Sequence, residues 1–231
     1  MAVSCALQPG WGQLDKLVGA IGKAGIGNVG AGDSRVAEAL KEALTIGTAN
    51  AVKLAGAQDG YFKNALIKIA MPPKLRLAEK GVRMVGGGPQ VDAFVLGMNR
   101  AAEKAAPEAS KYFKDAILKM TFSDAKAILK GGDTAATDFF RAKTSAQLVT
   151  AFRPHVEAAM GQVDVARKLE GVLDSTRKVP FLKAESFDLN DYVVQQAVSG
   201  LFTMVGQEEK KIRKDPAAQV TGLLREVFGS R

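Results

Sequence analysis

The sequence predicts an all-α fold, arranged as a single multi-helix bundle. Alanine, leucine and lysine are plentiful while aromatic residues make up only 6% of the chain, a composition that favours helices because these side chains lose little freedom there. Apolar residues also recur at helical spacing along most of the chain. Capping residues, prolines and glycines separate these periodic stretches. The chain of 231 residues is long enough for one domain with a sizeable core, which we expect over residues 33–231.

The N-terminal segment, residues 1–32, is expected to lie outside that domain. It has a weak helical pattern over residues 11–22, followed by a glycine-rich stretch with G-x-G-x-x-G spacing at residues 25–32. A nucleotide-binding loop of this spacing needs a buried strand before it, and no strand-like run precedes it here. We therefore interpret the stretch as a flexible linker.

The first helix of the domain is expected to begin at Asp33, with Asp33 or Ser34 as its N-cap, and to end near Gly60. Residues 66–71 then form the best strand candidate, because the two prolines that follow them favour an extended backbone. The irregular stretch 179–182 could pair with it. One short two-stranded β-ribbon is therefore an open alternative within the helical fold.

The remaining chain is a series of predicted helices. They are expected over residues 73–85, 91–105, 107–120, 124–130, 133–141, from 144 onward, 163–176, 188–214 and from 215 to the end. Thr121 and Asp124 have the spacing of a capping box before the short helix over residues 124–130. Pro154 should kink or break the helix that contains it. The helix over 188–214 is apolar nearly all round from Val193 to Val205, which predicts a position at the centre of the bundle.

The positive charge is concentrated in one segment. The net charge of the chain is +8. Residues 61–85 hold six basic residues and one acid, Glu79, so this segment supplies +5 of that total. On a helix, Arg76, Lys80 and Arg83 would share one face, hereafter the basic face. A basic amphipathic helix can bind anionic lipid or an acidic partner, although a plain solvated face is the alternative. Nucleic acid is not favoured, because no known binding motif is present.

Cys5 is the only cysteine, so the sequence predicts neither an internal disulfide nor a thiolate metal cluster, and we assign no metal or cofactor. The small residues around Cys5, Ala-Val-Ser before it and Ala after it, resemble the lipobox of bacterial lipoproteins. This context makes Cys5 a candidate lipidation site, and a periplasmic or cell-envelope location with a lipid anchor is the corresponding expectation. A free thiol near the chain terminus is the alternative.

Several ordered blocks resemble domain-of-unknown-function family 4197. They are NRAAE at 99–103, MTFSDA at 120–125, IL at 128–129, GD at 132–133, AAT at 135–137, FR at 140–141, KTS at 143–145 and EEKKIR at 208–213. The similarity spans roughly residues 36–228. It implies a bacterial protein of a family whose members mostly carry export signals, and it brings no established activity.

Polar residues of these blocks are the candidates for a pocket or for a structural network: Arg100, Glu103, Asp133, Thr137, Arg141 and Thr144. If they converged on a cleft, they could form the site of a hydrolase-like envelope enzyme. If they paired or capped helices, they would only hold the bundle together. With one histidine and no catalytic motif, the preferred prediction is a non-catalytic envelope lipoprotein. It would bind an anionic membrane surface, a lipid or other hydrophobic ligand, or an envelope protein partner.

Overall fold

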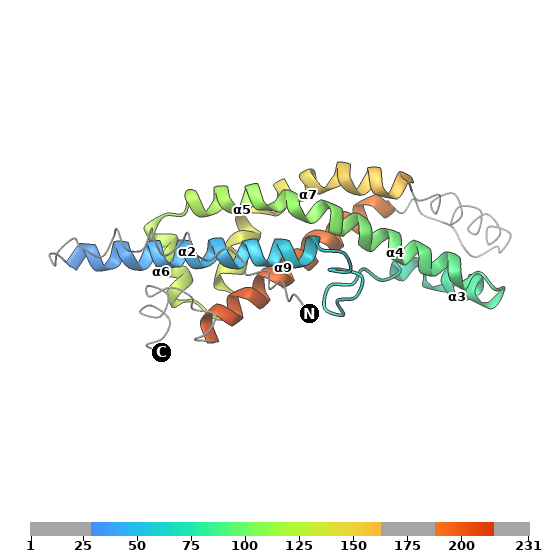
Figure 1. Ribbon diagram of the computed structural model, residues 1–231, viewed down its shortest axis with the longest axis horizontal. Helices are drawn as coiled ribbons and strands as arrows, with labels where there is room; N and C mark the ends of the chain where they lie inside the picture. The colour runs from blue at the N-terminus through green and yellow to red at the C-terminus, as the bar shows by residue number, and fades with distance from the viewer. Residues whose placement is uncertain (1–28, 163–187, 215–231) are drawn as a thin grey trace, which may run out of the picture. The chain divides into compact units, whose positions relative to one another are not determined.

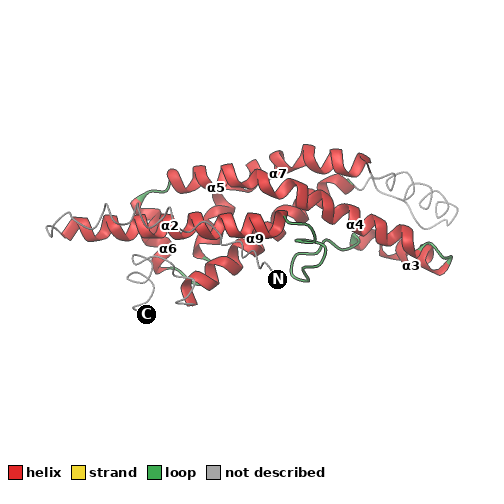
Figure 2. Ribbon diagram, viewed as in Figure 1, coloured by secondary structure: helices red, strands yellow, loops and turns green. Residues whose placement is uncertain are grey.

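The computed structural model describes residues 29–162 and 188–214 (Figure 1). This part of the chain consists of helices joined by loops and turns, with no strand (Figure 2). The all-α prediction is therefore confirmed for the described residues. The chain divides into two compact units, Met1–Ser34 and Arg35–Arg231, and nearly all of the described residues belong to the second. The predictions made for residues 1–28, 163–187 and 215–231 lie outside the described residues.

The helices follow the predicted order with shifted ends. They are α2 (Val29–Gly56), the 3-10 turn η2 (Pro73–Leu75), α3 (Arg76–Met84), α4 (Gly88–Ala105), the 3-10 turn η3 (Ala106–Glu108), α5 (Ala109–Leu118), α6 (Phe122–Lys130), α7 (Ala135–Gln162) and α9 (Leu189–Lys214). The capping box before α6 is confirmed. The Thr121 hydroxyl accepts a hydrogen bond from the backbone N–H of Asp124, whose carboxylate accepts one from the N–H of Thr121.

Two helix boundaries differ from the prediction. The predicted end at Arg141 and new start at Thr144 are wrong, because α7 runs unbroken through both and through Pro154. The Thr144 hydroxyl donates to the carbonyl of Phe140 in the same helix, at 2.7 Å, instead of capping a new one. Pro154 lies on the exposed side of α7, and a continuous buried stripe on the other side outweighs both local signals. At the other boundary, α2 begins at Val29, so residues 29–32 are helical and are not a linker.

The predicted strand at 66–71 is also wrong, and the structure gives the reason. Residues 68–71, the strap, have no partner strand among the described residues, and the side chain of buried Asn99 on α4 bonds to their backbone instead. Its carboxamide accepts from the N–H of Ile69 and donates to the carbonyl of the same residue, each at 2.8 Å. The Tyr192 hydroxyl on α9 donates to the carbonyl of Ala70 at 3.1 Å. Side chains of two helices thus satisfy the extended backbone, and a β-ribbon is not supported.

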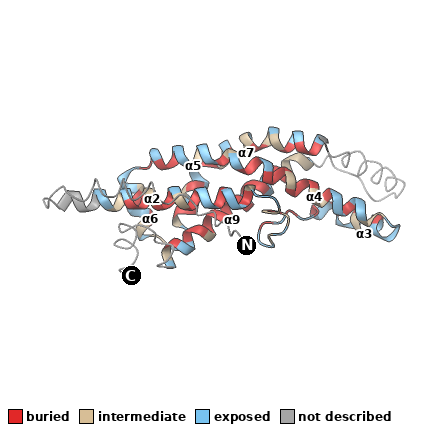
Figure 3. Ribbon diagram, in the orientation of Figure 1, coloured by how far each residue is buried: buried red, intermediate tan, exposed pale blue. Residues whose placement is uncertain are grey.

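The core of the second unit lies where α4, α5, α7 and α9 pack together, and Figure 3 shows their buried faces in red. The central position predicted for 193–205 is confirmed, since Leu201 on α9 is 0% exposed. The ring of Phe113 on α5 meets Phe140 and Phe202 edge to face, at centroid distances of 5.2 and 6.1 Å. No described helix is both long and apolar enough to cross a membrane.

Candidate anionic-surface site

Two of the predicted polar residues, Arg100 and Glu103, act together on the turn that follows α2. Arg100 forms ion pairs with Glu103 and with Asp59, both at 2.6 Å. The buried Glu103 carboxylate also accepts the backbone N–H groups of Tyr61 and Phe62, at 3.1 and 3.2 Å. The pair therefore holds the loop that leads to the strap, and neither side chain lines the groove that lies beside α3.

The other four polar residues lie elsewhere and contact different partners. The N–H and hydroxyl of Thr137 both donate to the carboxylate of Glu209, each at 2.8 Å. Asp133 pairs with Lys214 at 2.5 Å, and this hydrogen bond lowers the pKa of the Asp133 carboxyl. The Arg141 guanidinium lies over the ring of Phe202, 4.8 Å from its centroid, while Thr144 bonds within its own helix. The six candidates are therefore spread over separate contacts and do not form one pocket.

Glu209 is a structural residue of this region that the sequence did not single out. In the sequence it is only one letter of the EEKKIR block, yet its buried carboxylate also accepts the N–H of Ala136 at 2.9 Å. It therefore caps the first turn of α7 from a position more than seventy residues later in the chain. Arg213, one turn along α9, pairs with the same carboxylate at 2.8 Å.

The basic face lies on α3, which is fixed against α4 by its opposite side. Ala78 and Val82 are buried, whereas most of the remaining α3 surface is exposed (Figure 3). Leu77 is 67% exposed, Met84 86% and the following Val85 85%. Large apolar side chains at such exposure stand out in a folded domain when they cluster. The end of the α3–α4 pair therefore presents both charge and apolar surface to the surroundings.

The three cations of the basic face are not equivalent. Arg83 donates from Nε to Glu79 at 3.0 Å and from Nη2 to Asp92 on α4 at 2.7 Å. The carboxylate of Asp92, and secondly that of Glu79, raise the pKa of Arg83. By contrast, Arg76 and Lys80 are exposed and have no carboxylate partner within the part of the chain that the structure describes. Arg83 joins two helices, and the other two cations are available to a ligand.

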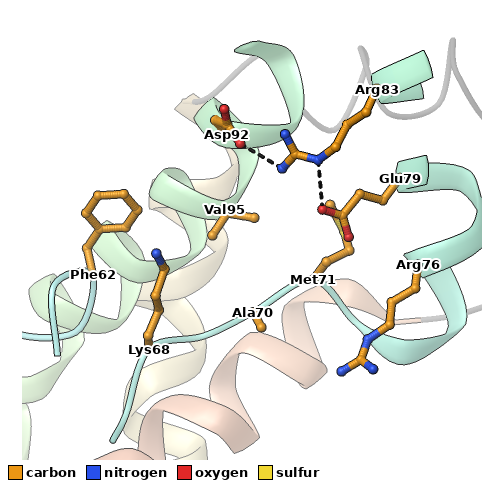
Figure 4. Close-up of a pocket in the computed structure, with 9 residues that line it drawn as sticks. All are labelled: Phe62, Lys68, Ala70, Met71, Arg76, Glu79, Arg83, Asp92 and Val95. Atoms are coloured by element: carbon orange, nitrogen blue, oxygen red, sulfur yellow. Dashed lines mark hydrogen bonds and ion pairs between the residues drawn. The ribbon is translucent and has the colours of Figure 1, made fainter. Parts of the chain in front are cut away.

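A groove of about 310 Å³ lies beside α3 (Figure 4). Its lining comes from the loop after α2, the strap, α3 and α4: Phe62, Lys68, Ala70, Met71, Arg76, Glu79, Arg83, Asp92 and Val95. The ammonium group of Lys68 lies 4.4 Å from the centroid of the Phe62 ring. In the sequence, Lys68 is only one of the six basic residues in 61–85. No local pattern around it predicts a groove.

The chemistry of these surfaces fits anions better than metal ions. Three cations and two carboxylates line the groove, a formal excess of +1. No group of three or more His, Cys, Asp or Glu side chains that could hold a metal ion occurs within residues 29–162 and 188–214. The groove and the exposed side of α3 share Arg76. Together they form one continuous candidate binding site for ligands that are anionic and partly apolar.

The fold defines a helix-bundle protein in which the polar side chains of the family-like blocks mainly hold helix ends and turns in place. The chain belongs to the family described as "Protein of unknown function (DUF4197)", whose family model matches residues 30–229. The resemblance seen in the sequence is thereby confirmed. The chain matches no curated protein and no solved structure.

Proposed function

We propose that this protein is a non-catalytic lipoprotein of the bacterial envelope that docks on an anionic membrane surface through α3. The observation that carries this proposal is the combination on one short helix of two exposed cations, Arg76 and Lys80, which have no carboxylate partner among the described residues, with the exposed side chains of Leu77 and Met84. Neither feature alone would identify a membrane surface. Side by side, they match the amphipathic pattern of helices that lie in the headgroup region.

The positions around α3 support this arrangement. At about 100° per residue, Leu77 and Met84 lie within about 20° of each other, and Lys80 is their neighbour on the side of Arg76. The opposite side, with Ala78 and Val82, is buried. The fold therefore fixes α3 so that Leu77 and Met84 face outward, and they could dip below the headgroups while the cations meet phosphate. Each basic residue near an anionic leaflet contributes about 1 kcal/mol.

A lipid on Cys5 would add a membrane anchor to the basic patch, which by itself binds reversibly. The lipobox-like residues around Cys5 support this part of the proposal. Mass spectrometry of the protein from its native host should find a diacylglyceryl adduct on Cys5. An unmodified thiol there would remove the anchor from the proposal.

The distribution of the six polar candidates supports a non-catalytic role. Arg100 and Glu103 are engaged with each other and with the turn after α2, and Thr137 is engaged with Glu209. A hydrolase site needs its acid, base and anion-binding groups around one reacting atom. These side chains serve different helix ends instead.

The test is co-sedimentation of the unlipidated chain with vesicles of phosphatidylglycerol and phosphatidylcholine, compared with phosphatidylcholine alone. Replacing both free cations, in Arg76→Gln/Lys80→Gln, removes about 2 kcal/mol, or about 30-fold in the partition constant at low salt. Lys126→Gln/Lys130→Gln is the matched control, because it lowers the net charge equally at two exposed positions on α6.

We expect the control to sediment like the wild type. Equal weakening of both double variants would mean that binding follows net charge and not α3. No binding of the wild type to the anionic vesicles would reject the membrane surface altogether.

A further inference from the structure

The turn that joins α3 to α4 is an uncharged, apolar surface. The two helices lie side by side up to this turn (Figure 1). Val82, one turn before Val85 on the same side of α3, is buried, so the cover that α4 gives to α3 ends before the turn. Met84 and Val85 are more exposed than Leu77, which lies about two turns earlier. Residues 84–91, hereafter the tip, contain no charged side chain.

The charges nearest to the tip are arranged in a definite order. Arg83 directly precedes the tip and Asp92 directly follows it, and these two residues pair with each other at 2.7 Å (Figure 4). Glu79 is the second partner of Arg83. Lys80, about 6 Å before Met84 along the helix axis, is the nearest cation of α3 without a carboxylate partner among the described residues. The end of the helix pair therefore presents apolar side chains first and a free cation about one turn behind them.

The backbone of the tip is held by hydrogen bonds of its own. Gly86 has a φ of 87°, and its N–H donates to the carbonyl of Arg83 at 3.2 Å. The N–H of Gly87 donates to the carbonyl of Val82 at 2.8 Å. These two bonds form a Schellman motif, which ends α3, and Pro89 in the first turn of α4 has no N–H. Because lipid offers no replacement for hydrogen bonds to water, a turn whose N–H groups are bonded or absent at these positions enters a membrane at a lower cost.

We infer that the tip is the part of this protein that penetrates the membrane, with Met84 and Val85 deepest, and that α3 meets the surface tilted and not flat. The inference rests on the proposed docking to an anionic membrane and adds its depth and orientation. A helix rises about 1.5 Å per residue, so Leu77 lies about 12 Å before Val85 along α3. Interfacial apolar side chains reach about 5–10 Å into the boundary between headgroups and acyl chains. With the tip at that depth, Lys80 lies near the phosphates and Leu77 nearer to water.

A lipid surface is the partner that this order of chemistry fits. From its end inward, the helix pair presents Met84 and Val85, then Lys80 and then Arg76. A membrane presents the complementary layers, since apolar chains lie below the anionic phosphates. The Schellman motif fixes the two apolar side chains in their exposed positions before binding, which reduces the ordering cost.

The experiment measures depth with a nitrobenzoxadiazole label on single cysteines of the full unlipidated chain, in which Cys5→Ser removes the native thiol. The labelled variants are Val85→Cys, Leu77→Cys and Leu118→Cys. Leu118 is the matched control, because it is as exposed as Leu77 and lies at the end of α5, outside the proposed surface. On vesicles of phosphatidylglycerol and phosphatidylcholine, the label at Val85 should gain the most fluorescence. Quenchers attached to the acyl chains should quench it more than the label at Leu77, and the label at Leu118 should stay in water.

A second measurement uses unlabelled variants. Met84→Ser/Val85→Ser should lower the partition constant for the same vesicles about tenfold, because two apolar side chains lose their transfer into lipid. Leu66→Ser/Leu118→Ser is the matched control, since it removes two exposed apolar side chains elsewhere, and it should bind like the wild type.

The outcomes separate the tip from the docking proposal. Vesicle binding with the tip label in water, or with the labels at Leu77 and Val85 equally deep, would overturn tip insertion and leave membrane docking standing. Equal weakening of both double serine variants would also overturn it, because a general loss of apolar surface would then explain the binding. No binding of the wild type to the anionic vesicles would reject the docking and the tip together.

Discussion

Removing the carboxylate of Glu209 should strongly destabilise the fold, although the residue lies far from the proposed membrane surface. In Glu209→Ala, α7 loses the acceptor for the N–H groups of Ala136 and Thr137 in its first turn. Arg213, whose side chain is 9% exposed, loses its carboxylate partner. One substitution therefore leaves two buried N–H donors without their acceptor and removes the carboxylate from the Arg213 guanidinium.

The magnitude can be worked from these contacts. Breaking a buried ion pair by removing one partner costs about 3–5 kcal/mol, and an unsatisfied helix N-terminus costs about 1 kcal/mol. The two costs overlap, because they concern the same carboxylate, and Arg213 keeps a hydrogen bond to the carbonyl of Ile128. We therefore expect a total loss of about 3–5 kcal/mol in the free energy of unfolding.

The adjacent Glu208 gives a matched control. It is also buried, but its partner Lys211 is exposed and its other partner, Asn50, is 3.4 Å away. Because Lys211 can turn to water, Glu208→Ala should cost about 1 kcal/mol. Urea unfolding followed by far-UV circular dichroism would measure both variants. Similar losses of stability for the two alanine variants would refute the assigned cap. Glu209→Gln keeps one acceptor oxygen, so its free energy of unfolding should lie between those of the wild type and Glu209→Ala.

Two further predictions concern stability. Leu201→Ala should lower the free energy of unfolding by about 2–5 kcal/mol, because Leu201 is fully buried. The same change at exposed Leu77 should cost less than about 0.5 kcal/mol and should weaken vesicle binding instead. Equal thermal midpoints for the two variants would contradict the assigned core. Lys63, and secondly Arg100, lower the pKa of Asp59 below its ordinary value of 3.8, so ionised Asp59 stabilises the fold above that value and this contribution is lost as the pH falls through the lower folded pKa. Below pH 3.8, Asp59→Asn should therefore lose stability less steeply than the wild type in acid unfolding. Asparagine is chosen because its side chain suits the left-handed backbone at this position. The same dependence of stability on pH in both proteins would argue against the ion pair.

Features that depend on neighbours in the sequence could be predicted. The capping box of α6 joins Thr121 and Asp124, three residues apart, and it is present as expected. The ion pair of Glu79 with Arg83 could also have been predicted, since residues four apart meet on a helix. The sequence prediction instead grouped Arg83 with Arg76 and Lys80 on the basic face.

Local patterns failed where a distant side chain replaced a local partner. Residues 66–71 have the composition of a strand, but Asn99 satisfies Ile69 from another helix. Likewise, Thr144 and Pro154 mark helix ends by their local preferences, yet α7 continues through both. Burial along a whole helix outweighs preferences of about 1–3 kcal/mol at single positions.

The sequence by itself determined that the described part of the chain is all-α, that residues 193–205 lie at the centre, and that the charge gathers in 61–85, because periodicity and composition are local properties. Only the tertiary structure decided which cations are free. Asp92 lies on the next helix and occupies Arg83, whereas no acid faces Arg76 or Lys80 among the described residues. The groove likewise needs Lys68, Arg76 and Val95 from three separate segments. Their proximity depends on how α3 and the strap pack on α4, and no spacing along the chain encodes that.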